Sequence, residues 1–161
     1  MGSLVSSAHA YNPACFDDTI RIIQSQLKGA FFDFTPPVVS FARGHRFDQR
    51  LQGWFGDVQI EDLWVPYFCV GSNLTKANID LFDTDTLWWA VRTSGTLPGI
   101  SAPQIRDGCL LFDGCLLDNL PMDVMRERME TSRVIAVDVF PPHDLKINVT
   151  EVQSPSGWWL L

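Results

Sequence analysis

The sequence predicts a mixed α/β fold, in which a sheet carries helices on both of its faces. Three observations predict this class. The chain has 161 residues, of which 46% are apolar, and this fits one domain with a sizeable core. Short apolar runs typical of strands alternate along the chain with segments of helical spacing. Residues 108–113 form an apolar run that ends at the turn pair Asp113-Gly114.

Three helices are predicted in the first third of the chain, over residues 1–12, 15–28 and 47–55. The first is rich in small and apolar residues and meets no proline before Pro13. The second has Asp17 and Asp18 in its first turn, where the helix dipole favours negative charge. Its apolar stripe at helical spacing is formed by Ile20, Ile23 and Leu27.

The middle of the chain predicts a β-hairpin and a further helix. Residues 66–74 read as a buried strand, and residues 77–82 alternate polar and apolar side chains as a partner strand would. Residues 86–94 predict a helix that is capped by Asp85 or Thr84 and ended by Gly95.

The segment around Asp113 is the most informative stretch of the sequence. An apolar strand runs into the turn, and polar residues 118–121 then open a helix. Residues 133–139 predict a second strand, which would place Asp113 in a βαβ unit. A carboxylate at the end of a buried strand, beside a glycine, is suited to act as a catalytic base. An ordinary turn aspartate is the alternative, since Asp-Gly is a common turn pair.

Charge and composition exclude several classes of function. The net charge is −7 and no basic cluster occurs, so nucleic acid is not expected as a partner. The three histidines and four cysteines lack metal-ligand spacing, so no metal and no cofactor is predicted. The cysteines are interpreted as reduced, and a disulfide between Cys109 and Cys115 is the alternative. The sequence shows no signal peptide and no apolar run of membrane-spanning length.

Residues 30–45 contain a bulky apolar segment with two interpretations. It contributes to the core or to a partner contact, or it forms a lid that touches an acyl chain. The four residues 158–161, Trp-Trp-Leu-Leu, form an abrupt apolar terminus. An exposed end of this kind is unusual, so we expect it to pack on the core or to belong to an interrupted element.

Several segments, taken together and in their order along the chain, resemble the patatin-like phospholipase family, and within it the neuropathy target esterase branch. The segments are residues 55–68 (FGDVQIEDLWVPYF), 87–92 (LWWAVR), 96–99 (TLPG), 111–114 (LFDG), 118–121 (DNLP), 134–138 (VIAVD) and 156–161 (SGWWLL). The resemblance covers nearly the whole chain. It implies an incomplete three-layer α/β/α patatin-like domain, of which residues 1–161 form the C-terminal portion.

The resemblance also implies a catalytic residue. Such proteins are serine hydrolases that use a Ser–Asp dyad without histidine, and Asp113 falls on the position of the aspartate. Gly114 matches the next residue of the motif, whereas Cys115 stands where the family has glycine or alanine. If the backbone at Cys115 needed a positive φ, a side chain there would be strained.

The family's serine lies in a Gly-x-Ser-x-Gly elbow, and this chain contains no such motif. Met1 and Gly2 resemble the last two residues of the elbow, so the resemblance places the serine immediately before Met1. The Gly-rich loop that stabilises the oxyanion would lie further upstream. We therefore expect the chain to be a fragment that begins just after the nucleophile.

The resulting expectation is a patatin-like serine esterase or lysophospholipase, whose substrate is a lipid ester or lysophospholipid. The expected location is cytoplasmic, with peripheral contact to a membrane surface. The alternative is a catalytically inactive, truncated domain that serves as an interaction module. A further alternative is that the chain folds poorly by itself, because a sheet edge would be unpaired.

Overall fold

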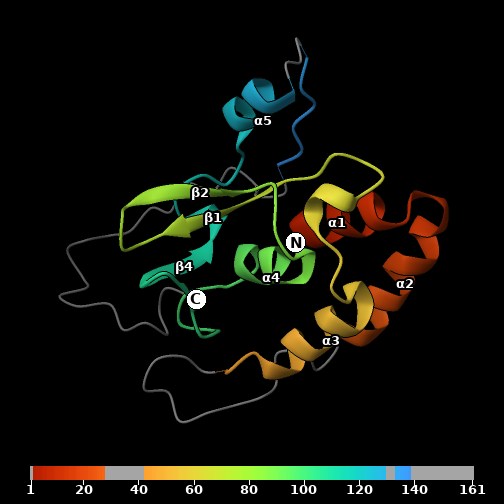
Figure 1. The fold of residues 1–161 in the computed structure, drawn as a ribbon, viewed down its shortest axis with the longest axis horizontal. Helices are drawn as coiled ribbons and strands as arrows, with labels where there is room; N and C mark the ends of the chain where they lie inside the picture. The colour runs from red at the N-terminus through yellow and green to blue at the C-terminus, as the bar shows by residue number, and fades with distance from the viewer. Residues whose placement is uncertain (1, 28–41, 130–132, 139–161) are drawn as a thin grey trace, which may run out of the picture. The chain divides into compact units, whose positions relative to one another are not determined.

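The computed structural model describes residues 2–27, 42–129 and 133–138. Contacts divide the chain into two compact units, Met1–Pro121 and Met122–Leu161. The first unit holds four α-helices and a four-stranded sheet, and the second holds one α-helix among its described residues (Figure 1). The mixed α/β class predicted from the sequence is therefore confirmed. That helices cover both faces of the sheet stays a prediction.

The helices of the first unit follow the predicted positions closely. They are α1 (Gly2–Tyr11), α2 (Phe16–Leu27), α3 (His45–Phe55) and α4 (Leu87–Ser94). A 3-10 turn, η1 (Pro13–Cys15), separates α1 from α2, with Pro13 at its first position. The helix α4 begins one residue later than predicted. Thr86 occupies its N-cap position, and the carboxylate of Asp85 accepts a hydrogen bond from the Thr86 N–H at 2.6 Å.

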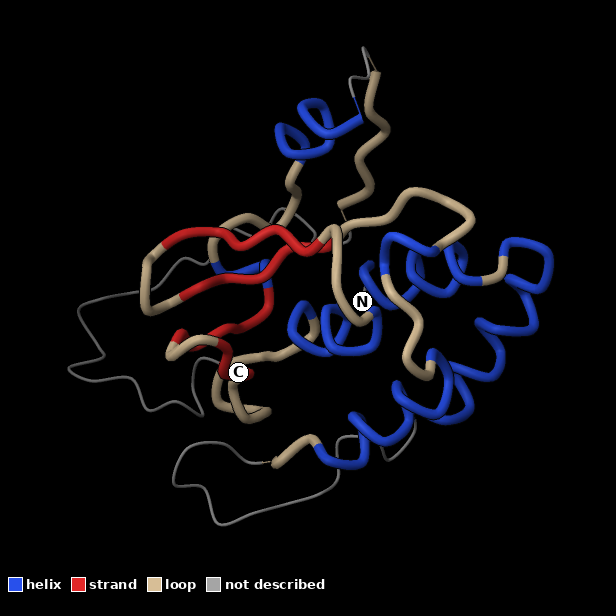
Figure 2. Tube along the Cα trace, in the orientation of Figure 1, coloured by secondary structure: helices blue, strands red, loops and turns tan. Residues whose placement is uncertain are grey.

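The sheet has the strand order β2-β1-β4-β3, and every pairing in it is antiparallel. Its strands are β1 (Cys69–Asn73), β2 (Asn78–Phe82), β3 (Gln104–Arg106) and β4 (Cys109–Asp113). The predicted hairpin of β1 and β2 is confirmed, while β3 was not predicted. A tight turn of Asp107 and Gly108, both with positive φ, joins β3 to β4 (Figure 2).

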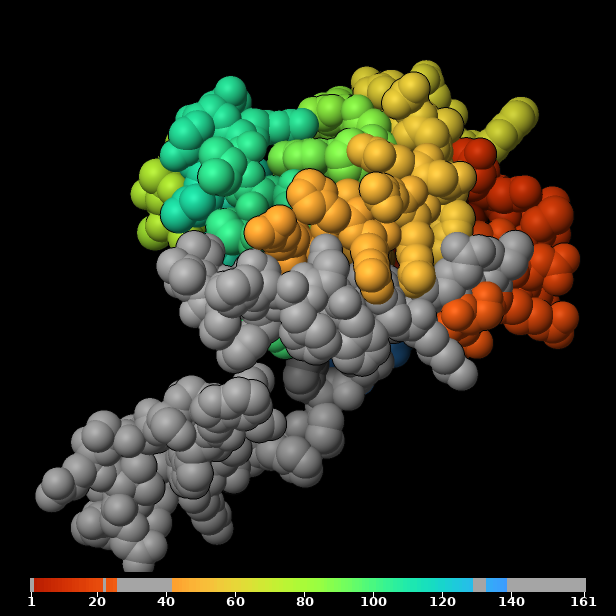
Figure 3. Space-filling view, turned by 90° about the horizontal axis from the view of Figure 1, so that it is seen from below, coloured from red at the N-terminus to blue at the C-terminus, as the bar shows by residue number. Residues whose placement is uncertain are grey.

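The core lies where α4 packs between the sheet and the other helices. The helix α4 contacts β1 and β4 on one side and α1 and α3 on the other (Figure 1). The helix α3 buries Phe47, Leu51 and Phe55, which recur every four residues along one face. Figure 3 shows the opposite face of α3, in orange and gold, at the surface of this unit.

In the second unit, α5 (Met122–Met129) follows Pro121, as predicted. The predicted strand at residues 133–139 is wrong over its described part. Residues 133–138 have no strand pairing, and Ile135 and Val137 are 95% and 76% exposed. A strand needs a neighbour for its backbone N–H and C=O groups, and none is present among the described residues. The βαβ unit expected around Asp113 is therefore not formed there.

Some expectations concern residues that the structure does not describe. They are most of the apolar segment predicted at residues 30–45, of which residues 30–41 are not described, the terminal residues 139–161, and Met1. Within the described ranges, no helix has the length and apolar character needed to cross a bilayer.

Candidate active site

Asp113 lies at the junction of two elements. It is the last residue of β4 and the N-cap of a 3-10 turn, η3 (Gly114–Leu116). Its carboxylate accepts a hydrogen bond from the Cys115 N–H at 3.0 Å. An aspartate suits this position because its short side chain can reach the N–H two residues ahead. The carboxylate is half-buried and its direction is set by the turn.

The backbone of Asp113 is held from two sides. On one side, Asp113 pairs with Gly71 of β1 within the sheet. On the other side, its N–H donates to the carbonyl of Thr96 at 2.8 Å. Thr96 follows α4 and is completely buried. These contacts fix the end of β4 between a neighbouring strand and the loop after α4.

Gly114 is required by a close approach to β1. A Cβ atom at this position would lie 2.5 Å from Cγ2 of Val70 and 2.8 Å from its carbonyl oxygen. The Gly114 carbonyl accepts hydrogen bonds from the N–H groups of Leu117 and Asp118 at 3.1 and 2.9 Å. The glycine predicted beside Asp113 thus lets the turn press against the strand.

Cys115 occupies η3 without backbone strain. The non-glycine residues with positive φ in the described ranges are Ala77, Asp85 and Asp107, so Cys115 adopts an ordinary conformation. Burial raises the pKa of the Cys115 thiol, and the negative charge of Asp113 and a hydrogen bond to it raise it further. The thiol therefore stays protonated beside the carboxylate. The turn accommodates cysteine where the sequence raised the possibility of strain.

Ser72 is the serine that faces this turn from the sheet. It pairs with Phe112 and is completely buried. Its hydroxyl donates to the Gly114 carbonyl at 3.3 Å. Ser72 therefore stabilises the turn, and its hydroxyl is not presented to a substrate.

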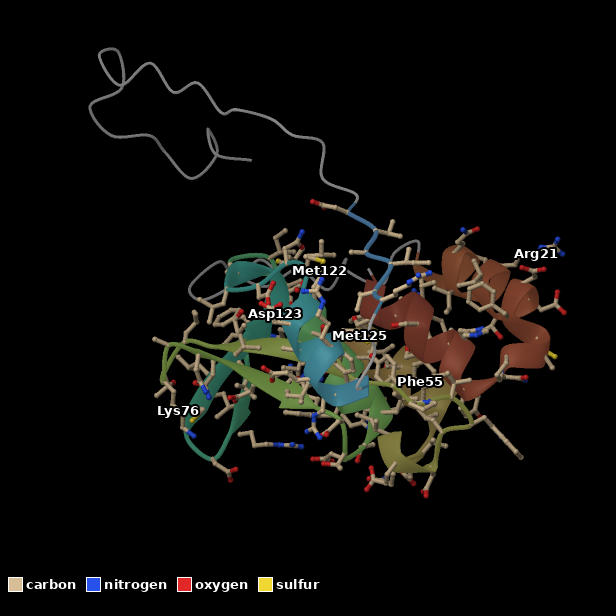
Figure 4. All side chains as sticks on the ribbon, turned by 90° about the horizontal axis from the view of Figure 1, so that it is seen from above. Arg21, Phe55, Lys76, Met122, Asp123 and Met125 are labelled. Carbon is tan, nitrogen blue, oxygen red and sulfur yellow. The ribbon has the colours of Figure 1, made fainter. Side chains whose placement is uncertain are left out.

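The first turn of α1 lies at the same end of the sheet as Asp113. The hydroxyl of Tyr67 donates to the carbonyl of Ser3 at 3.1 Å. Tyr67 comes two residues before β1 begins, and this end of β1 is the one that contacts Asp113 and Gly114. Figure 4 shows Lys76 at the opposite tip of the β1–β2 hairpin, whereas Phe55 and Arg21 lie among the helices.

Gly2 is the first residue of α1, and it has open space around it. A Cβ atom there would have no neighbour within 4 Å. Its companion in the predicted elbow remnant, Met1, lies outside the described residues. The structure thus brings the start of α1 and the Asp113 turn to one end of the sheet through Tyr67.

The sequence profile of patatin-like phospholipases matches residues 1–126. The match covers more than three quarters of the chain and includes Asp113 and both elements that hold it. The chain belongs to the patatin-like phospholipase family.

Individual relatives agree with this assignment. Lysophospholipase NTE1 of Candida albicans is 37% identical over 130 residues, which are 81% of this chain and 9% of that protein. Neuropathy target esterase sws of Drosophila melanogaster is 38% identical over 131 residues, 80% of this chain and 9% of the relative. Human patatin-like phospholipase domain-containing protein 6 is 41% identical over 131 residues, with shares of 80% and 9%. The chain thus spans about a tenth of these relatives.

In this patatin-like chain Arg92 is a buried cation. An arginine beside tryptophans, as at residues 88–92, either positions a substrate or pairs with a carboxylate or an aromatic ring. The Arg92 side chain is 1% exposed, forms an ion pair with Asp48 at 2.5 Å and lies over the ring of Phe47. Arg92 therefore has the second of these arrangements.

The cysteines of the patatin-like chain are all free, so the alternative disulfide between Cys109 and Cys115 is not formed. Cys69 and Cys109 are buried, whereas Cys15 is exposed. Burial raises the pKa of the Cys69 thiol to about 12, which keeps it neutral in the core.

Two contacts at the site were missed by sequence reasoning. One is the Thr96 carbonyl that holds Asp113, and the other is the Tyr67 hydroxyl that holds α1. A buried tyrosine usually has a hydrogen-bond partner, so the residue type gave a hint for Tyr67. A backbone carbonyl leaves no signal in the sequence, so Thr96 could not have been found.

A surface hollow of about 580 Å³ lies elsewhere on the first unit. Its walls come from Tyr11, Asn12, Pro13, Ala14 and Trp64. Neither Asp113 nor a residue of its turn borders this hollow, so we assign no catalytic role to it.

Proposed function

We propose that Asp113 is the general base of a Ser–Asp dyad that hydrolyses carboxylic esters of lipids, with lysophospholipids as the substrate class. The observation that carries the proposal is the fixed, half-buried carboxylate at the end of β4. The names of two relatives, lysophospholipase and neuropathy target esterase, support the reaction class. The serine is assigned to the position just before Met1, as the resemblance implies.

The chemistry requires a base because a serine hydroxyl is a weak nucleophile at neutral pH. Asp113 accepts the hydroxyl proton while the serine oxygen attacks the ester carbonyl. The proton then passes to the departing alcohol oxygen, which leaves an acyl-enzyme. Asp113 next takes a proton from water, whose oxygen attacks the acyl carbon. Asp113 then gives this proton to the serine oxygen as the acyl–serine bond breaks and the fatty acid leaves. Oxyanion donors are assigned to the segment before the serine.

The position of α1 supports this assignment. Tyr67 ties the first turn of α1 to the start of β1, and Asp113 pairs with the same strand two residues after that start. Tyr67 thus holds the first turn of α1 at the end of the sheet where the carboxylate lies, and this supports a serine just before Met1. The N-terminus of α1 adds a partial positive charge, which favours the developing oxyanion.

Ester hydrolysis by an extended protein tests the proposal. The 161 residues are joined behind the segment that precedes the matched region in lysophospholipase NTE1 of Candida albicans, and lysophosphatidylcholine hydrolysis is measured. We expect activity that falls about 10²–10⁴-fold with Asp113→Asn, the typical contribution of a general base. Asp118→Asn is the matched control. Asp118 lies five residues after Asp113, and its carboxylate accepts a hydrogen bond from the Leu120 N–H.

Two results would contradict the proposal. An extended protein that folds but shows no hydrolysis would favour the alternative, an inactive patatin-like module that binds a partner. Full activity in the Asp113→Asn variant would show that another group accepts the proton.

The proposed substrate class also places the protein at a lipid surface. Lysophospholipids partition into bilayers and micelles, so a hydrolase for them has to reach an interface. We expect the protein to co-sediment weakly with phosphatidylcholine vesicles containing lysophosphatidylcholine. No sedimentation at any lipid concentration would contradict this contact.

A further inference from the structure

We propose that Arg92 is a positioning residue for Asp113 and that it acts through Thr96. The proposal deepens the function proposed above and rests on the role of Asp113 in it. Three contacts carry the inference: Arg92 to Asp48, Arg92 to Thr96, and Thr96 to Asp113.

Among the described residues, Arg92 is the largest side chain that is fully buried. Its guanidinium lies between α3, α4 and the loop that follows α4. Nε donates to the carboxylate of Asp48 at 2.5 Å, and Nη1 donates to the hydroxyls of Thr96 and Ser101 at 2.5 and 3.2 Å. Burying a charge is costly unless it is paired and hydrogen-bonded. Asp48 and the two hydroxyls offset part of this cost, while Nη2 is buried without a hydrogen-bond partner among the described residues.

The guanidinium fixes both ends of one loop. Thr96 begins the loop and Ser101 ends it, and the same nitrogen atom, Nη1, donates to both hydroxyls. The planar fork of arginine suits this arrangement, because its donors have fixed directions.

Thr96 transmits this restraint to the candidate base. The Thr96 hydroxyl accepts a hydrogen bond from the Arg92 guanidinium and donates one to the Arg92 carbonyl at 2.9 Å. Arg92 thus restrains the Thr96 side chain through two hydrogen bonds. The carbonyl of Thr96 accepts the N–H of Asp113 at 2.8 Å. This bond lies on the side of Asp113 that faces away from its sheet partner, Gly71.

The path from Arg92 through Thr96 to Asp113 is indirect, and we call it the relay. Arg92 pairs with Asp48, and it reaches Asp113 through the Thr96 hydroxyl and the Thr96 carbonyl. A restrained carboxylate is what the proposed reaction requires, because a catalytic group must be held in the reactive geometry.

Hydrogen exchange in the 161-residue chain tests the relay without any need for activity. The variant Thr96→Val keeps the shape of the side chain but removes the hydroxyl. We expect the Asp113 amide to exchange about tenfold faster, while amides of the β1–β2 hairpin change little. Thr96→Ser restores the hydroxyl, and we expect it to return the Asp113 amide toward its original rate.

Thr93→Val is the matched control. Thr93 is also fully buried, and its hydroxyl donates to the Trp89 carbonyl four residues earlier, as that of Thr96 does to Arg92. The Thr93 hydroxyl donates to Trp89 and not to Thr96 or Asp113, so the loss of this hydroxyl should not affect the Asp113 amide more than others. Equal acceleration of Asp113 and hairpin amides in Thr96→Val, or equal effects in both valine variants, would overturn the proposal.

Activity in the extended protein gives a second, separable result. We expect Thr96→Val to lower kcat about tenfold with little change in KM, because the base and not the substrate contact is displaced. If the extended protein is inactive while the exchange result holds, the proposed hydrolysis fails and the relay stands as a structural restraint. If hydrolysis is normal and the exchange pattern is uniform, the relay alone fails.

Discussion

The N–H of Cys115 donates to the carboxylate of Asp113 at 3.0 Å, and the Cys115 thiol lies against the same carboxylate. A residue that departs from the family motif therefore contacts the candidate base directly. Any residue type at position 115 could donate the backbone hydrogen bond. The thiol of Cys115 is what distinguishes this chain from one with glycine or alanine at that position.

The Cys115 thiol should become more reactive when the charge of Asp113 is removed. Burial raises the pKa of this thiol first, and the charge and hydrogen bond of Asp113 raise it further. Asp113→Asn removes the second contribution, so the pKa falls and more thiolate is present at any given pH. We expect iodoacetamide to modify Cys115 several-fold faster at pH 8.5 in this variant.

Peptide mass spectrometry distinguishes the four cysteines in this experiment. Cys15 is exposed and serves as the internal control, whose rate should not change. An unchanged alkylation rate at Cys115 would mean that Asp113 does not influence its thiol.

Gly114→Ala should destabilise the first unit. The new Cβ would approach the Val70 carbonyl to 2.8 Å, and backbone cannot move aside cheaply. Overpacking of this kind costs about 1–3 kcal/mol, which urea unfolding can measure. Gly53→Ala is the control, because Gly53 lies inside α3 with no neighbour within 4 Å of a Cβ. That variant should gain about 0.5–1 kcal/mol from helix propensity, and a similar loss in both would contradict the explanation.

Asp48→Asn should destabilise the protein by leaving the Arg92 charge buried without its carboxylate. The Arg92 side chain is 1% exposed and that of Asp48 is 26% exposed. Breaking a buried pair from one side costs about 3 kcal/mol. The exposed pair of Asp18 and Arg21 offers the comparison, and Asp18→Asn should cost less than about 0.5 kcal/mol. Equal denaturation midpoints for the two variants would show that the buried pair contributes no more to stability than the exposed pair.

The free energy of unfolding should fall as pH rises above 9. Burial raises the pKa of Cys69 from 9.0 to about 12, so the folded state binds a proton that the unfolded state releases between these values. This contribution is fully present below pH 9 and is lost as pH rises toward 12. One such group gives a slope of about 1.4 kcal/mol per pH unit in that window. Burial also raises the pKa of Tyr67, which adds to the slope with the same sign.

Urea unfolding at pH 8 and pH 10 measures this dependence. Cys69→Ala should reduce the difference between the two pH values, whereas Cys15→Ala, at an exposed cysteine, should leave it unchanged. An unaltered pH dependence in Cys69→Ala would assign the effect to other groups.

Patterns over short distances were sufficient to predict most elements of the chain. The helical stripe of α3, the alternation that marks β2, and the apolar run of β4 each reflect which side chains face the core. The turn at Asp113 was likewise predictable, because Asp and Gly satisfy its local hydrogen bond and its close packing. The family resemblance then attached a chemical role to the same aspartate.

Other features depend on partners far away in the sequence. The strand predicted at residues 133–139 has the right composition, but over residues 133–138 its backbone has no strand to pair with. The strand β3 was missed because three residues carry too little pattern, and it is stabilised by pairing with β4. Strand order and antiparallel direction were decided by such pairings.

The sequence by itself determined that a carboxylate stands at the end of a buried strand with glycine beside it. The tertiary structure decided what holds that carboxylate: Gly71 across the sheet, the Thr96 carbonyl, and Arg92 behind Thr96. The physical reason is that a turn is encoded by neighbouring residues, whereas its restraint comes from buried groups that must satisfy one another's hydrogen bonds. Those groups meet only when the helices and the sheet pack together.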